Sequence, residues 1–194
     1  MIARENANTR IEGLITARWS PRSFDASAMP QEDLDVILEA AGWAASAYNI
    51  QPWTFLYAHR GDANWDRFLS YLVEFNQSWA KDASVLIFIV SDRMQGKPGE
   101  DRSPNHSHSF DAGAAWANMA LQATAMGYHA HGMTGIAFGT AEEALGIPAD
   151  HRLEAAVAIG RQAPKDRLPE ALREREVASG RKLLSQIAKP GNFA

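Results

Sequence analysis

Two groups of basic side chains lie near opposite ends of the sequence, and both are suited to an anionic ligand. Arg18-Trp19-Ser20-Pro21-Arg22 places two guanidinium groups and a hydroxyl close together, and Lys165-Asp166-Arg167 adds two further cations. A guanidinium donates two parallel hydrogen bonds to a phosphate, so the two groups could converge on one phosphate. Ion pairing at the surface with Asp25 or Glu32 is the alternative that charge alone favours.

A string of small and polar residues lies between a predicted helix and a predicted strand. It runs Ala44-Ala-Ser-Ala-Tyr-Asn-Ile-Gln-Pro-Trp53. Small side chains at a helix end allow a flat ring system to approach the backbone, and Asn49, Gln51 and Pro52 favour a polar turn. The string therefore favours a ligand site over a simple connection.

Several other kinds of catalytic site are missing from the sequence. It contains no G-x-S-x-G, no P-loop and no G-x-G-x-x-G pattern. It has no cysteine, which excludes disulfides, thiolate ligands and a cysteine nucleophile. The pairs His106/His108 and His129/His131 raise a metal hypothesis, but no HExxH or EF-hand pattern accompanies them. We expect structural histidines and no metal site.

The overall composition limits the partners and the location of the protein. Its 194 residues include 19 Lys and Arg against 23 Asp and Glu, a formal net charge of −4. Nucleic-acid binding depends largely on surplus cations, so this balance argues against it. No apolar run is long enough to cross a bilayer, and the first residues lack the apolar stretch of a signal peptide. We expect a cytoplasmic protein that forms a single domain over residues 1–194.

Apolar periodicity predicts an alternation of helices and strands. Helices are expected over residues 9–17, from Pro30, over 64–80 and 110–126, and from a capping-box pattern at Thr140. Strands are expected over residues 53–58, 84–90, 128–133 and 153–160. Residues 93–107 form a long loop, and Trp43, Trp53 and Trp116 are expected in the core. This order predicts helices on both faces of one sheet.

The combined motifs resemble those of the nitroreductase family of FMN-dependent oxidoreductases. The resemblance runs from about Ile11 to the C-terminus, and the order and spacing of its parts carry it. The matching residues are Arg18, Ser20 and Arg22; Ala45, Ser46, Asn49, Gln51, Pro52 and Trp53; Asn76 ahead of Asp82-Ala-Ser84; Phe110 to Gly113 and Asn118; Gly132 to Gly135; Ala158 to Gly160; Lys165, Arg167 and Pro169; and Ser179 to Ser185.

This resemblance implies a fold and an assembly. The expected fold is α+β with three α/β/α layers, in which helices flank a central mixed, largely antiparallel sheet. The expected assembly is a homodimer that binds FMN at the interface between its subunits. Residues 164–194, broken by three prolines, would form a C-terminal arm that embraces the partner.

The resemblance also implies roles for individual residues. Arg18, Ser20, Lys165 and Arg167 would hold the FMN phosphate and ribityl chain. Arg22 and Asn76 would face the pyrimidine edge of the flavin. The backbone of Met133, Thr134 and Gly135 would lie beside the ring, with an N–H of Thr134 or Gly135 facing N5.

Three further positions complete the implied cofactor site. Ala45 and Ser46 would pack on the ring from the partner subunit, with Ala45 standing where the family usually has proline. Trp19 stands where a second basic residue is common and would contact the flavin through its backbone. No side chain is needed as an acid, a base or a nucleophile, because the cofactor carries the chemistry.

The implied activity is hydride transfer from NAD(P)H through flavin N5 to a flat acceptor such as a nitroaromatic or a quinone, with ping-pong turnover. Three alternatives remain open: a flavin-binding protein without turnover, a relative that performs dehalogenation or dehydrogenation, and a histidine-based metal protein. The sequence leaves the physiological substrate and the choice between NADH and NADPH open.

Overall fold

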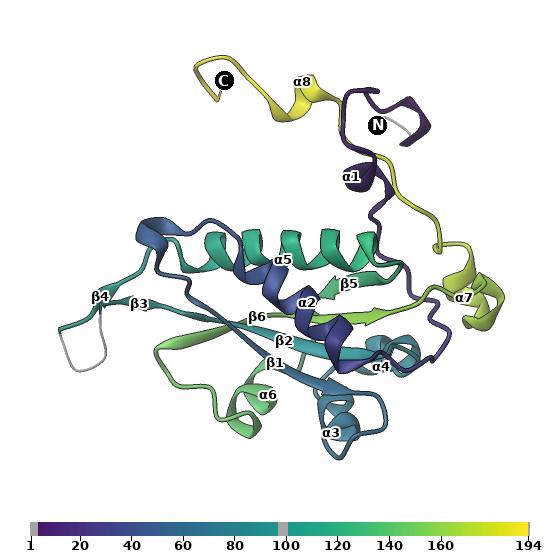
Figure 1. Ribbon diagram of the computed structural model, residues 1–194, viewed down its shortest axis with the longest axis horizontal. Coiled ribbons are helices and arrows are strands. Elements are labelled where there is room, and N and C mark those ends of the chain that lie inside the picture. Colours follow the sequence, from purple (N-terminus) through teal and green to yellow (C-terminus); the bar gives the residue numbers. More distant parts are fainter. Residues whose placement is uncertain (1–3, 97–100, 194) are drawn as a thin grey trace.

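A four-stranded antiparallel sheet lies at the centre of the structure (Figure 1). The computed structural model describes residues 4–96 and 101–193. The strands are β1 (Trp53–His59), β2 (Val85–Asp92), β5 (His129–Met133) and β6 (His151–Gly160), in the order β1-β2-β6-β5. Every neighbouring pair is antiparallel. All four strands lie where apolar runs predicted them, and β5 is an edge of the sheet.

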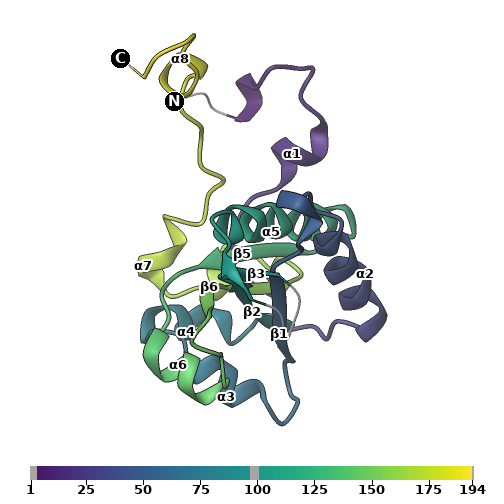
Figure 2. The same ribbon diagram turned by 90° about the vertical axis from the view of Figure 1, so that its left-hand side faces the viewer.

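Helices cover both faces of the sheet (Figure 2). One face packs against α2 (Gln31–Gly42) and α5 (His108–Ala125), and the other against α3 (Trp65–Ser70), α4 (Glu74–Ala80) and α6 (Phe138–Ala144). Successive side chains of β2 alternate between these layers, so Ile87 joins one core and Phe88 the other. The expected three-layer α+β architecture is confirmed.

The helix predicted over residues 64–80 is interrupted between α3 and α4. Tyr71, Leu72 and Val73 form a turn instead: Leu72 forms a bridge with Ile136, and the Val73 N–H donates to the Gly135 carbonyl oxygen at 3.0 Å. These long-range backbone hydrogen bonds replace the local ones that a continuous helix would make. The turn brings the start of α4 against the end of β5.

Three other local predictions were wrong. Helix α6 begins at Phe138, ahead of the capping box expected at Thr140, because the Ala137 N–H is held by the Tyr71 carbonyl at 2.8 Å. Only residues Gly13–Ala17 of the first predicted helix are helical, as α1. Trp43, expected in the core, is 80% exposed after the end of α2. Trp53 and Trp116 do pack against the core.

The expected loop at residues 93–107 contains a short antiparallel pair, β3 (Met94–Gln95) with β4 (Ser103–Pro104). Residues 97–100 of that loop lie outside the described part of the chain. In residues 4–96 and 101–193 no helix has the length and apolar character needed to cross a bilayer.

The two ends of the chain project together from the body of the molecule (Figures 1 and 2). The projecting N-terminal end holds η1 (Arg4–Asn6) and α1, and the projecting C-terminal end holds α8 (Leu184–Ile187). Before it, η3 (Lys165–Arg167) and α7 (Glu170–Arg173) lie against the body, where Leu168 and Leu172 join the core. Both ends expose large apolar side chains to solvent within a single chain. These are Ile11, Leu14, Ile15, Val177, Leu183, Leu184, Ile187 and Phe193.

Candidate functional site

A cavity of about 620 Å³ lies between α5 and the end of β5. Five residues predicted for ligand binding line it together: Arg22, Asn76, Met133, Thr134 and Gly135. The rest of its lining comes mainly from α5, β6 and β5. Those residues include Ser109, Ala112, Gly113, Trp116, His131, Gly132, Glu154 and Ala155. The cavity thus joins segments that are far apart in sequence.

Two glycines allow the backbone of β5 and the following turn to approach their neighbours closely. A Cβ atom at Gly135 would overlap the Asn76 side-chain amide, and one at Gly132 would come within 3.0 Å of the Trp116 ring. Neither gap tolerates even a methyl group without rearrangement. The Asn76 amide and the Trp116 ring therefore pack directly against the backbone of Gly135 and Gly132, in the wall of the cavity.

Asn76 fixes the conformation of that wall. Its side chain is buried, and Nδ2 donates to the Gly135 carbonyl oxygen at 3.1 Å. The same oxygen accepts the Val73 N–H at 3.0 Å. Two donors on one carbonyl oxygen hold the Gly135–Ile136 peptide group in place. The interruption between α3 and α4 is thus what positions Asn76.

A second hollow of about 310 Å³ gathers arginines from both ends of the chain. Arg22 and His131 line both hollows, so the two adjoin. Predicted residues Arg18, Trp19 and Ser20 lie here, and the Arg18 side chain donates to Ser20 Oγ at 3.3 Å. Five further residues, none of which the sequence motifs assigned to the cofactor, complete the lining. They are Arg4, Arg175, Val177, Ser179 and Arg181.

Glu176 holds the C-terminal segment against this arginine pocket. Its carboxylate is buried, and Oε1 accepts the backbone N–H of Arg22 at 2.7 Å and of Ser23 at 2.9 Å. On the other side, the Arg4 side chain donates to the carbonyl oxygens of Arg18 at 3.0 Å and Ser179 at 3.3 Å. These bonds bring the guanidinium groups of both termini to one place.

The positive charges in the arginine pocket destabilise one another. Burial, followed by the charges of Arg181 and Arg4, lowers the pKa of Arg18. Burial also lowers the pKa of Arg22, against the opposing effect of Glu176. Burial lowers the pKa of His131 to about 4, and the nearby charges of Arg22 and Arg18 act in the same direction. His131 is therefore neutral at neutral pH, and the pocket favours an anion.

The other predicted cations lie outside this pocket. Lys165 and Arg167 form η3 on the exposed surface, where Arg167 donates to the carbonyl oxygen of Asp25 at 3.0 Å. Neither lines either of the two hollows described above. The expected convergence of Lys165 and Arg167 with Arg18 is not seen within one chain. The tail supplies Arg175 and Arg181 there instead.

Ala45 and Ser46 also lie apart from the cavity within the described chain. They precede η2 (Ala47–Asn49), where Tyr48, Asn49 and nearby Gln51 have positive φ angles of 51°, 55° and 54°. Ser46 Oγ accepts the Gln51 N–H at 3.0 Å, and the buried Asp111 accepts the Ala47 N–H at 3.1 Å. Those bonds stabilise a backbone that L-residues rarely adopt.

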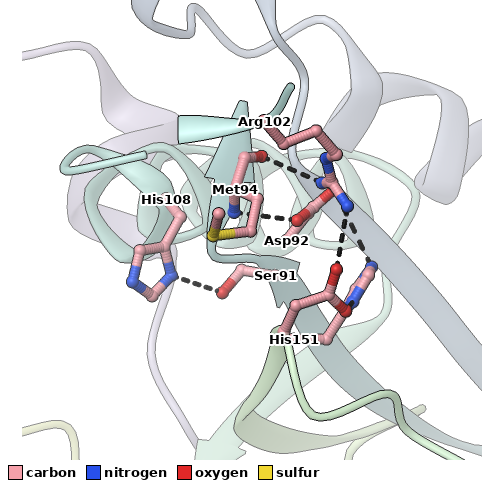
Figure 3. A network of polar contacts seen from close by, with 7 residues as sticks. Ser91, Asp92, Met94, Arg102, His108 and His151 are labelled. Carbon is pink, nitrogen blue, oxygen red and sulfur yellow. Dashed lines mark hydrogen bonds and ion pairs between the residues drawn. The ribbon is translucent and has the colours of Figure 1, made fainter. Parts of the chain in front are cut away.

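A cluster of possible metal ligands consists of Asp92, Asp150 and His151. Their potential ligand atoms lie within 4.8 Å of one another. Arg102 pairs with Asp92 (Figure 3) and with Asp150 Oδ2 at 2.8 Å. The guanidinium compensates the negative charge that would attract a cation. We interpret the group as an ion-pair cluster that ties β4 to the end of β2.

The sequence matches the nitroreductase family model over residues 15–74 and 62–161. This match covers most of the chain, and the fold and the cavity agree with it. The chain therefore belongs to the nitroreductase family. A protein of 15.4 kDa from Mycolicibacterium smegmatis, described as uncharacterised and encoded in the ask 5′ region, is 32% identical over 126 residues, which are 64% of this chain and 82% of that protein.

Two solved structures are similar in sequence as well as in fold. The crystal structure of an oxidoreductase containing FMN has 47% identity and a TM-score of 0.94, covering 100% of this chain and 99% of the other. A protein from Desulfovibrio desulfuricans, assigned to the nitroreductases and solved in complex with FMN, has 27% identity and a TM-score of 0.75, covering 96% and 99%.

Proposed function

We propose that this protein is an FMN-dependent oxidoreductase that transfers hydride from NAD(P)H to a flat electron acceptor. The observation that carries the proposal is the junction at Arg22 and His131 of a glycine-walled cavity with an arginine pocket. FMN has a matching shape, a flat ring joined by a chain to a phosphate. The family and the FMN-containing structures at 47% and 27% identity support the same cofactor.

The residues present fit this cofactor in chemistry as well as in shape. Arg22 Nε is buried and has no hydrogen-bond partner among the described residues. A buried donor without a partner is costly, and a polar ring edge beside Arg22 would satisfy it. Asn76 and Trp116, packed on Gly135 and Gly132, fix the backbone that lines one side of the cavity. The cations of the arginine pocket suit a phosphate.

We assign the phosphate to Arg18, Ser20 and Arg181, with Arg4 and Arg175 adding positive charge. The backbone of Met133, Thr134 and Gly135 would hold the ring, and Arg22 and Asn76 would bind its pyrimidine edge. Trp19 contributes backbone beside the ribityl chain. Ala45 and Ser46 act on the ring of the partner subunit. We retain the prediction that Lys165 and Arg167 bind the phosphate, but residues of a partner subunit would be needed to complete that site.

FMN, when bound, supplies the redox chemistry by accepting a hydride at N5 and passing it to a second substrate. The protein's own residues position and stabilise it. The Arg22 cation favours the negative charge that reduction places on the pyrimidine edge. Asn76 holds the Gly135 carbonyl, and with it the turn whose N–H groups we direct toward N5. The cavity would receive the nicotinamide and then the acceptor in turn.

Anaerobic reduction tests this activity directly. The purified holoprotein is expected to be yellow and to lose its absorbance near 450 nm, a property of the free cofactor, when NADH or NADPH is added without air. Colour should return when a quinone or a nitroaromatic is added. A yellow protein whose spectrum neither nicotinamide changes would instead be a flavin-binding protein without turnover.

Variants distinguish the two sets of candidate phosphate ligands. Arg181→Gln removes a cation from the arginine pocket and should weaken FMN binding by about tenfold or more, since a hydrogen bond to a charged group contributes about 1.5–3 kcal/mol. Arg167→Gln, the matched control outside the pocket, should change it by less than about threefold. Quenching of FMN fluorescence by apoprotein measures both. The opposite order would assign the phosphate to Arg167.

We propose that the protein works as a homodimer in which the C-terminal arm crosses the partner subunit. Apolar side chains at both ends are exposed in a single chain, including Leu184 at 69% and Phe193 at 96%. Trp43 after α2 and Phe110 near the start of α5 are also exposed, at 80% and 82%. Apolar area of this kind is typical of an obligate interface.

Shortening the chain tests the role of the arm. A protein that ends at Lys182 loses α8 and the exposed apolar residues after it but keeps Glu176 and Arg181. We expect sedimentation equilibrium to give a dimer for the full chain and a monomer for the shortened one, with the circular dichroism spectrum of the helices retained. A shortened chain that stays dimeric at the same concentration would place the interface elsewhere.

A further inference from the structure

We propose that Glu154 is a specificity-determining residue that selects acceptors carrying a cationic or hydrogen-bond-donating substituent and disfavours acceptors carrying a carboxylate. The proposal rests on the proposed function, because it concerns the second substrate of that same cavity. It is carried by the position of Glu154 in the sheet, by the contacts of its carboxylate and by the charges that face the cavity.

Glu154 occupies a β-bulge of β6. Ile89 of β2 pairs with Ala155, whereas the next residue, Val90, pairs with Leu153, so Glu154 has no residue opposite it. As a result Glu154 and Ala155 both line the cavity, although successive strand residues normally face opposite sides. Bulges commonly redirect a side chain beside a functional site.

The bulge places Glu154 near the reacting end of the proposed site. The last pair between β5 and β6 is Met133 with Ala156. Glu154 lies two residues before Ala156 on β6, at the end of the sheet where Thr134 and Gly135 leave β5. Glu154, Thr134 and Gly135 all line the same cavity. An acceptor that stacks near Gly135 therefore lies close to this carboxylate.

Hydroxyl groups hold one oxygen of the carboxylate in place. Glu154 Oε1 accepts hydrogen bonds from Ser91 Oγ and Ser109 Oγ, each at 2.6 Å, and lies 3.4 Å from His108 Nδ1. Ser91 is fully buried and also contacts His108 Nδ1 at 2.8 Å (Figure 3). A side chain with so many partners is preorganised to present charge to a ligand.

The remaining contact compensates the charge only weakly. Glu154 Oε2 lies 3.4 Å from Arg152 Nε, and the Arg152 side chain is 60% exposed while that of Glu154 is 16% exposed. Pairs with such an exposed partner contribute little because water screens them. Among the described residues that line the cavity, Glu154 is the acid and Arg22 the permanent cation. We assign Arg22 to the flavin, which leaves Glu154 to interact with the acceptor.

Matched acceptors test the proposal. The holoprotein should reduce 4-nitrobenzylamine, a cation, with kcat/KM about tenfold higher than 4-nitrobenzoate, an anion; tenfold corresponds to about 1.4 kcal/mol. Glu154→Gln keeps the acceptor atoms for Ser91 and Ser109 but removes the charge, and should bring the ratio to within about twofold of one. Glu154→Asp retains the charge and should keep most of the preference.

Two controls separate this proposal from the proposed function. Glu143→Gln makes the same change in net charge at an exposed position of α6, and should keep the wild-type ratio. Binding of the unreactive benzylamine and benzoate to the holoprotein, measured by calorimetry, needs no turnover and should show the same preference and the same loss in Glu154→Gln. A ratio that is equal in wild type and Glu154→Gln, with the flavin still reduced by nicotinamide, would overturn the role of Glu154 alone.

Discussion

The structure depends on bringing several guanidinium groups into one partly desolvated pocket at the meeting point of the two chain ends. Burial, followed by the positive charges of Arg181 and Arg4, lowers the pKa of Arg18, and burial and the charge of Arg181 lower that of Arg4. Repulsion of this kind opposes folding unless an anion joins the cluster. Glu176 compensates part of this positive charge, but its Oε1 already accepts the backbone N–H groups of Arg22 and Ser23. The FMN phosphate that we propose for this pocket would supply the rest of the compensation.

The cavity beside the pocket follows from a second constraint, the close approach of backbone at the edge of the sheet. Gly132 and Gly135 leave no room for side chains against Trp116 and Asn76. The turn between α3 and α4 carries Asn76 to this place, and the β6 bulge turns Glu154 into the same space. We therefore interpret the cavity as a rigid frame in which a cofactor supplies reactivity and the chain supplies shape and charge.

The sequence predicted the parts of this arrangement that local patterns encode. The four strands, α2, α5 and the residues Arg18, Arg22, Asn76 and Gly135 follow from apolar runs and from family motifs. The interruption of the helix at Leu72 did not, because it depends on backbone hydrogen bonds to residues 135–137. The exposure of Trp43 was missed because an aromatic residue at a helix end is equally typical of a core and of an interface.

The proposed phosphate ligands of the tail likewise depend on long-range contacts that local sequence patterns do not encode. Two segments of the tail, around Arg167 and around Arg181, each carry one lysine and one arginine. The contacts of Glu176 and of Arg4 with Ser179 show which one reaches Arg18. The bulge at Glu154 is similarly invisible in sequence, since it is a property of the register between β2 and β6.

Riboflavin lacks the phosphate of FMN, so the affinities of the apoprotein for the two flavins show whether the arginine pocket binds that phosphate. We expect riboflavin to bind about a hundredfold more weakly at low salt, because it loses two or more charge-assisted hydrogen bonds. The difference should shrink as salt is added. Equal affinities for the two flavins would contradict it.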